Sequence, residues 1–281
     1  MPPVRWQRKK RSDNIEDRRG RVGTKLGLGG TIVVLILAAI FGRDFLARLG
    51  DSGSSKQSSE DPLPRDKDKD ADLVDFISFA LDDMQNVWGS EFKKLGKQYQ
   101  PAKLVLFTRS VRSACGFQSA ATGPFYCPGD NKAYIDLSFY RALEDRFGAP
   151  GDFAQAYVLA HEIGHHVQNL LGFSARMRRE QRNNPRKKNE LSIRLELQAD
   201  CFAGLWGHST QKRNLLEQGD VDEGLEAAAA IGDDRLQKQA TGHVTPESWT
   251  HGSSEQRKRW FRRGFDAGTI DACDTFSAVR L

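Results

Sequence analysis

Hydrophobic positions recur with helical spacing in the stretch that begins near residue 71. Leu73, Phe76, Ile77, Ala80 and Met84 fall on one face of a 3.6-residue period, which predicts a helix over about 71–95. The pattern of the chain further on predicts five more helices, over about 138–147, 153–171, 190–207, 220–239 and 253–267.

Two regions between these helices favour strands instead. The continuous apolar run in Lys103–Thr108 is typical of a buried strand. Residues 113–137 alternate short β-favouring stretches with Gly and Pro, which indicates hairpins. We therefore predict a mostly helical α+β domain with a small sheet.

A different pattern marks the N-terminal part of the chain. Residues 26–42 form an uncharged apolar run of 17 residues, at the short end of what spans a bilayer. A dense basic stretch precedes it, so we predict a single transmembrane helix with the N-terminus in the cytoplasm and the rest of the chain outside the membrane. A cleaved signal peptide or a buried core helix are the alternatives, but bulky Ile40 and Phe41 and the absence of a polar face disfavour them.

The segment after this run has the composition of a linker. Gly and Ser dominate residues 50–55, and alternating Lys and Asp follow at 66–70, so the segment lacks the apolar surface to order itself. The predicted organisation is a basic cytoplasmic N-terminus at 1–25, an anchor at 26–42, a flexible linker at 43–70 and a domain at 71–281.

The net charge of +5 first suggests a nucleic-acid partner, and its distribution argues against one. Residues 1–25 contain nine Lys/Arg and three acidic residues, so the remaining 256 residues sum to −1. The basic charge is therefore an N-terminal feature and not a footprint on the domain. A second basic run, residues 175–190 with seven Lys/Arg, is interpreted as a solvated loop, with an acidic partner as the alternative.

The predicted helix over 153–171 contains the pattern H-E-x-x-H, at His161, Glu162 and His165. Residues four apart lie one above the other on a helix, so the two imidazoles can bind one ion. Glu162 is rotated away from that face and is placed to address a water molecule as general base. Two histidines with a carboxylate suit zinc.

A third ligand must come from elsewhere in the chain. Gln168 and Leu171 occupy positions where metzincins need Gly and His, which excludes that class. The His₂Glu class takes a Glu from a later helix, and Glu196 with Asp200 sits on one face of such a helix. We predict Glu196 as the zinc ligand and Asp200 as the acceptor of a hydrogen bond from His161; the alternative is that both acids pair with Arg194 or with the basic run.

These motifs resemble those of gluzincin-type metallopeptidases, and more narrowly the bacterial family called "putative neutral zinc metallopeptidases". The resemblance rests on HEIGHH at 161–166 and RLELQADCFAG at 194–204, and extends to 11–20, 115–135, 251–257 and 273–276. It implies a zincin-like domain, one zinc ion and hydrolysis of peptide bonds, and it says little about the substrate.

One further histidine is a candidate for catalysis. A peptidase must stabilise the oxyanion that forms on the attacked carbonyl, and His251 lies in a Gly/Ser-rich turn before the last helix. We predict that His251 contributes to this, with Arg257 orienting it or binding a substrate carboxylate; an ordinary surface histidine is the alternative. His166 is expected to be structural, and His208 and His243 carry no supporting pattern.

The four cysteines form no C-x-x-C motif, which disfavours a thiolate zinc site. Cys115 and Cys127 flank a predicted hairpin, and a pair between Cys201 and Cys273 would tie the C-terminal tail to the helix of Glu196. We predict disulfides 115–127 and 201–273, with buried free cysteines as the alternative.

The sequence thus predicts a membrane-anchored zinc metallopeptidase that acts on a peptide or protein substrate, which an edge strand within 113–137 would align. The alternative function is a zinc-containing binding or scaffold protein of the cell envelope, without catalysis. A fourth protein ligand such as His251 would favour that alternative, whereas Glu162 would have no purpose in it.

Overall fold

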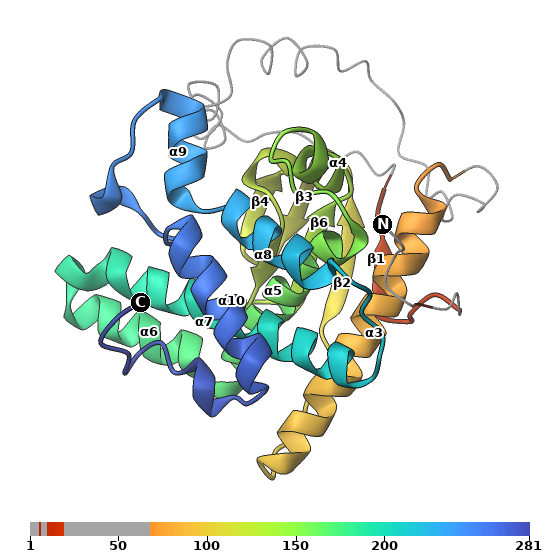
Figure 1. Cartoon of the computed structure of the whole chain (residues 1–281), viewed down its shortest axis with the longest axis horizontal. Helices are drawn as coiled ribbons and strands as arrows, with labels where there is room; N and C mark the ends of the chain where they lie inside the picture. Colours follow the sequence, from red (N-terminus) through yellow and green to blue (C-terminus); the bar gives the residue numbers. More distant parts are fainter. Residues whose placement is uncertain (1–5, 7–9, 20–67) are drawn as a thin grey trace.

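The computed structural model describes residues 6, 10–19 and 68–281, and all structural statements below concern these residues. Two groups of elements make up the fold, a small sheet with its flanking helices and a set of helices packed beside it (Figure 1). The predicted α+β class, mostly helical with a small sheet, agrees with this arrangement.

Four strands form the main sheet in the order β1-β2-β6-β5, with β1 (Ile15–Asp17), β2 (Lys103–Phe107), β5 (Phe125–Cys127) and β6 (Lys132–Asp136). The pairs β1–β2 and β2–β6 are parallel, and β5 runs antiparallel to β6 and forms one edge. A separate hairpin joins β3 (Ser110–Ser113) to β4 (Gly116–Ser119). The hairpins that the sequence predicts within 113–137 are thus divided between two sheets.

The helices follow the predicted order with three differences. They are α3 (Ala71–Lys94), α4 (Ser138–Asp145), α5 (Asp152–Leu171), α6 (Phe173–Asn183), α7 (Lys188–Lys212), α8 (Asp220–Ala230), α9 (Asp233–Thr241) and α10 (Ser254–Ala267). α5 is largely buried, because the sheet, α3, α7 and α8 all pack against it. The chain thus places the H-E-x-x-H helix at the centre of the fold.

The first difference is that the predicted loop at 175–190 is wrong over most of its length. Residues 173–183 form α6, and Met177 is buried against Leu191 and Leu195 of α7. Packing against α7 through Met177 and the partly buried Phe173 holds this short helix in place, even though most of its remaining surface is polar or charged.

The second difference is a break in the predicted helix over 220–239. The chain turns at Gly232, where an added Cβ would lie 2.4 Å from the Ser254 nitrogen. The backbone N–H of Asp233 donates to Gly252 O, so the start of α9 is held against the turn that precedes α10. This close approach ends α8 and starts a new helix.

The third difference lies at the N-terminus and corrects the predicted fold class and localisation. No helix of the described residues is long and apolar enough to cross a membrane, and the predicted anchor at 26–42 lies outside those residues. β1 pairs with β2, and Arg11 forms an ion pair with Asp75 of α3 at 2.7 Å. A single crossing between β1 and β2 would put these hydrogen-bonded strands on opposite sides of a bilayer, so the predicted single-pass topology, with a cytoplasmic N-terminus and an extracytoplasmic domain, is wrong. The predicted domain boundaries at 25, 42 and 70 remain a prediction.

Candidate metal centre

α5 and α7 are the two helices that bring the candidate ligands together, and a glycine sets their separation. A Cβ on Gly164 of α5 would lie 2.9 Å from Ala199 O of α7, so any side chain there would push the helices apart. This contact lies between His161 and His165 on one helix and beside Glu196 on the other.

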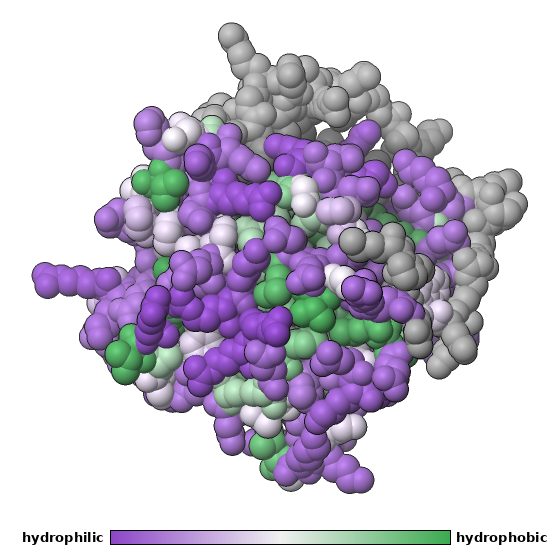
Figure 2. Space-filling view, viewed as in Figure 1, coloured by the Kyte–Doolittle hydropathy of each residue, from purple (hydrophilic) through white to green (hydrophobic). Residues whose placement is uncertain are grey.

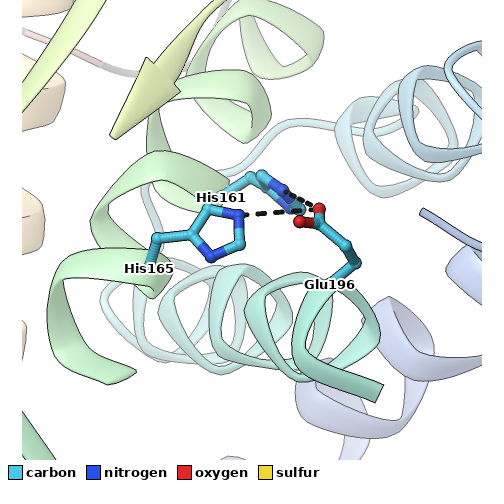
Figure 3. A group of neighbouring side chains, drawn as sticks. All are labelled: His161, His165 and Glu196. Carbon is cyan, nitrogen blue, oxygen red and sulfur yellow. Dashed lines mark hydrogen bonds and ion pairs between the residues drawn. The ribbon is translucent and has the colours of Figure 1, made fainter. Parts of the chain in front are cut away.

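The side chains of His161, His165 and Glu196 converge across this helix pair (Figure 3). Each offers a ligand atom within 4.8 Å of the other two. Glu196 Oε2 lies 3.2 Å from His161 Nε2 and 3.5 Å from His165 Nε2. The three side chains are 8%, 16% and 18% exposed, so the cluster is shielded but open to a small ligand.

The Nδ1 atom of each of these two histidines already has a hydrogen-bond partner in the protein. His161 Nδ1 lies 2.8 Å from Asp200 Oδ1, and His165 Nδ1 lies 2.9 Å from Gln168 Oε1. Gln168 is itself held, because its Nε2 donates to Leu195 O of α7. Both rings therefore present Nε2 to the centre of the cluster, in the tautomer that a metal site requires.

Asp200 is fully buried and accepts hydrogen bonds from two further side chains besides His161. Tyr157 donates to its Oδ1 at 2.5 Å, and Arg257 donates to both oxygens at 2.8 Å. Burial alone would raise the pKa of Asp200, but Arg257 and His161 outweigh it and lower the pKa to about 2. The carboxylate that orients His161 is thus held ionised.

The charges around the cluster favour a cation. Burial alone would lower the pKa of His161, yet Asp200 and Glu196 raise it to about 9. Burial likewise opposes ionisation of Glu196, but the two histidines hold its pKa well below the usual range. Two imidazoles and a carboxylate in a site that attracts positive charge match the donor set of zinc.

Glu162 lies beside this cluster and does not belong to it. Its side chain is 6% exposed, and its Oε2 is buried without a hydrogen-bond partner among the described residues. Burial raises its pKa, and the charges of His161 and His165 oppose this only in part. A buried carboxylate with a free oxygen next to a metal site suits the transfer of a proton from a water molecule.

His251 lies in the turn before α10, near enough to Glu196 for their charges to interact. Its ring is about half exposed, and its Nδ1 lies 3.1 Å from Asp233 Oδ1. Burial of the ring lowers its pKa, but Asp233 and Glu196 together raise it above the ordinary value. Among the described residues the ligand cluster contains only His161, His165 and Glu196, so His251 is not a fourth ligand there.

The two roles predicted for Arg257 are wrong. Its side chain is only 2% exposed, and its guanidinium donates hydrogen bonds to Asp200, to the Tyr157 hydroxyl and to Ile231 O. It therefore neither reaches a substrate nor contacts His251. No local pattern indicates that Arg257 pairs with Asp200, because α7 and α10 meet only in the fold.

The remaining predicted residues lie outside the ligand cluster. His166 contacts Tyr126 and Gln100 O, on the side of α5 that faces the sheet, and His208 contacts Phe265 O. Both predicted disulfide pairs are present, with Cα–Cα distances of 5.8 Å for Cys115–Cys127 and 5.5 Å for Cys201–Cys273. The second pair starts at the residue after Asp200 and so ties the C-terminal tail to the site helix.

Sequence reasoning missed four residues that shape the site, Tyr157, Gly164, Gln168 and Asp233. Two of them had a usable signal: Tyr157 precedes His161 by four residues, and Gln168 follows His165 by three, so each lies on the ligand face of α5. Asp233 had none, because α9 approaches His251 only through the turn at Gly252.

Comparison with known proteins identifies the family of this chain. The sequence matches the family described as "Putative neutral zinc metallopeptidase" over residues 4–276. It is 48% identical to the uncharacterized protein YpfJ of Escherichia coli K12, over 97% of this chain and 99% of that protein. It is 42% identical to the uncharacterized protein Rv2575 of Mycobacterium tuberculosis H37Rv, over 75% of this chain and 74% of that protein. No solved structure matches the chain. With the family covering nearly the whole sequence and the metal-type cluster at its centre, the chain belongs to the neutral zinc metallopeptidase family.

Proposed function

We propose that this protein hydrolyses peptide bonds with one zinc ion held by His161, His165 and Glu196. The observation that carries the proposal is the convergence of these three side chains within 4.8 Å, with both imidazoles turned to present Nε2. A bound zinc ion supplies Lewis acidity, which activates a water molecule and polarises a carbonyl group.

The protein's own residues perform the remaining tasks. Asp200 holds the His161 ring through Nδ1, and Gln168 does the same for His165. Glu162 accepts the proton of the attacking water and passes it to the leaving amine, which its buried position and raised pKa support. His251, whose pKa is raised by Asp233, donates to the oxyanion that develops on the attacked carbonyl.

The substrate backbone needs a surface to lie along. β5 is an edge strand of the main sheet, and Tyr126 on it reaches α5 through His166. We propose that an extended peptide pairs with this edge, which would bring a peptide bond past the metal centre.

The alternative of a zinc-containing scaffold without catalysis has less support. A purely structural zinc site is closed by four protein ligands, and the described residues supply three. Glu162, with its unpartnered buried oxygen, would also be costly to keep in a site that does no chemistry.

Two variants test the proposal on the full chain. Glu196→Ala should lose or greatly weaken the zinc that plasma mass spectrometry detects in the parent, at about one ion per chain. Glu162→Gln should keep the zinc and lose hydrolysis of a mixed peptide library. Glu255→Gln, at an exposed position on α10, is the surface control and should change neither.

The outcomes separate the parts of the proposal. A folded parent without zinc would overturn the metal centre. Zinc retained in Glu196→Ala would exclude Glu196 as the third ligand. Normal cleavage by Glu162→Gln would overturn the assigned general base.

A further inference from the structure

The segment that joins the two ligand helices carries a local excess of positive charge. We call residues 173–190 the basic hairpin; it comprises α6 and the start of α7. It contains seven Lys/Arg and two Glu, whereas the rest of 71–281 contains twenty Lys/Arg and twenty-five Asp/Glu. The hairpin is therefore a local positive patch on a part of the protein that is otherwise net negative.

These positive charges are exposed and mostly without counter-charges. The seven residues with high exposure are Arg176, Arg178, Arg179, Arg182, Arg186, Lys187 and Lys188. Within the described part of the chain only Arg176 has a carboxylate within ion-pair distance, that of Glu180 at 3.7 Å. The surface around α6 and the start of α7 is mostly hydrophilic, with one apolar cluster in the same region of the view (Figure 2).

The arrangement of the charges works against the helices that carry them. Arg178 and Arg182 are like charges at i,i+4, which destabilise an isolated helix. Lys187 and Lys188 lie at the N-cap and first residue of α7, where the helix dipole disfavours a cation. Proteins accept such a loss of helix stability at functional surfaces, and an anion bound at this surface would offset the repulsion between the positive charges.

The hairpin lies close to the metal centre. Lys188 precedes Glu196 by eight residues, which is about 12 Å along a helix axis. Asn189 donates to Glu247 O at 2.9 Å, so the start of α7 also contacts the segment that leads to His251. An extended peptide covers about 12 Å in about four residues.

We propose that the basic hairpin is a docking surface for acidic peptide segments, and that the substrates carry Asp or Glu about four residues from the bond that is cut. The second part rests on the proposed function. The first part requires only that an acidic peptide binds to the hairpin, with or without cleavage.

The test compares two peptides on the full chain. They share the same central sequence and differ in having three Asp or three isosteric Asn residues, placed in turn on each side of the centre. Binding is measured by fluorescence anisotropy with the Glu162→Gln variant, and cleavage is measured with the parent. We expect the acidic peptide to bind about tenfold more tightly at low salt, and the preference to fall to about twofold in about 0.5 M NaCl.

Two charge reversals on one helix provide the matched pair. Lys187→Glu/Lys188→Glu places acids at the N-terminus of α7, where the dipole favours them, so the variant should fold. It should remove the preference for the acidic peptide. Lys212→Glu reverses an exposed charge at the other end of α7, about 24 Å from Glu196, and should leave the preference intact.

Each result decides one claim. Cleavage without any preference for acid leaves the proposed function standing and overturns the docking surface. Acid-selective binding without cleavage leaves the docking surface standing and overturns the proposed function. Binding of anionic vesicles or polynucleotides that depends on Lys187 and Lys188, without any preference for the acidic peptide, would overturn the peptide assignment.

Discussion

Replacing Asp200 is the most demanding test of how the site is built, because its buried carboxylate accepts hydrogen bonds from three other side chains. It accepts hydrogen bonds from Tyr157, from Arg257 at both of its oxygens, and from His161 Nδ1. Asp200→Asn keeps the shape and replaces one oxygen with an N–H₂ group. Whichever way the amide turns, a donor then faces a donor, and the Arg257 charge is left buried without its counter-ion.

The expected loss follows from breaking a buried ion pair on one side. We expect Asp200→Asn to lower the free energy of unfolding by about 3–5 kcal/mol, measured by urea denaturation with a chelator present. Because the His161 ring is no longer fixed, zinc affinity should also fall about 10–100-fold in competition with a chromophoric chelator. Asp222→Asn, an exposed position on α8, is the control and should stay within about 0.5 kcal/mol of the parent.

A double variant separates the interaction between Asp200 and Arg257 from the contacts that each of them makes with other residues. Asp200→Leu/Arg257→Met removes both charges, so it should cost less than the two single changes together, by about 2 kcal/mol or more. Full additivity would show that the two side chains are not coupled. A stable Asp200→Asn with the zinc affinity of the parent would refute the assigned role of Asp200.

Three further predictions concern the frame around the site. Gly264→Ala should lower the free energy of unfolding by about 3 kcal/mol in urea denaturation, because the new Cβ would lie 1.9 Å from Cys201 O and force α10 away from α7; an unchanged midpoint would show that the helices are not in contact there. Replacing Cys201 and Cys273 by Ala should cost about 4 kcal/mol, since the bridge closes a loop of 72 residues; a change below about 1 kcal/mol in the same assay would contradict this. Burial and the nearby carboxylates of Asp152 and Asp220 raise the pKa of Glu223 to about 7 in the folded state. The folded state therefore holds the Glu223 proton at pH values where the unfolded chain has lost it, so the free energy of unfolding should fall as the pH rises from about 4.5 to about 7. Glu223→Gln should remove about 1 kcal/mol of that fall, after allowance for solvent screening, in melting curves recorded across the range; parallel pH profiles for parent and variant would refute the assignment.

Local patterns were sufficient to predict the parts of the fold in which apolar spacing is regular. α3, α5, α7 and α10 lie close to the predicted ranges, because each buries an apolar face along most of its length. α6 was predicted as a loop, because one buried methionine among five charged residues gives no visible period. β1 was not predicted for another reason. Its three residues are too few to show a pattern, and they pair with a strand almost ninety positions away.

The candidate site could likewise be predicted from the sequence only in part. The spacing of His161 and His165 follows from helix geometry, and Glu196 and Asp200 from a second helix with the same spacing. What the sequence did not contain was the approach of α9 and α10, which brings Asp233 to His251 and Arg257 to Asp200. Those contacts depend on the tertiary fold and leave no mark on local spacing.

The position of β1 has a practical consequence for anyone who produces this protein. A truncated version that starts at residue 71 would keep every residue of the metal centre, yet it would strip the partner from one side of β2. The backbone groups of Leu104 and Leu106, which now bond to Asn14 O and the Arg18 N–H, would face water. β2 would then be an apolar edge strand open to a second molecule, which is a common start of aggregation. Insoluble material from such a truncation would reflect the missing strand and would carry no information about the metal or the chemistry.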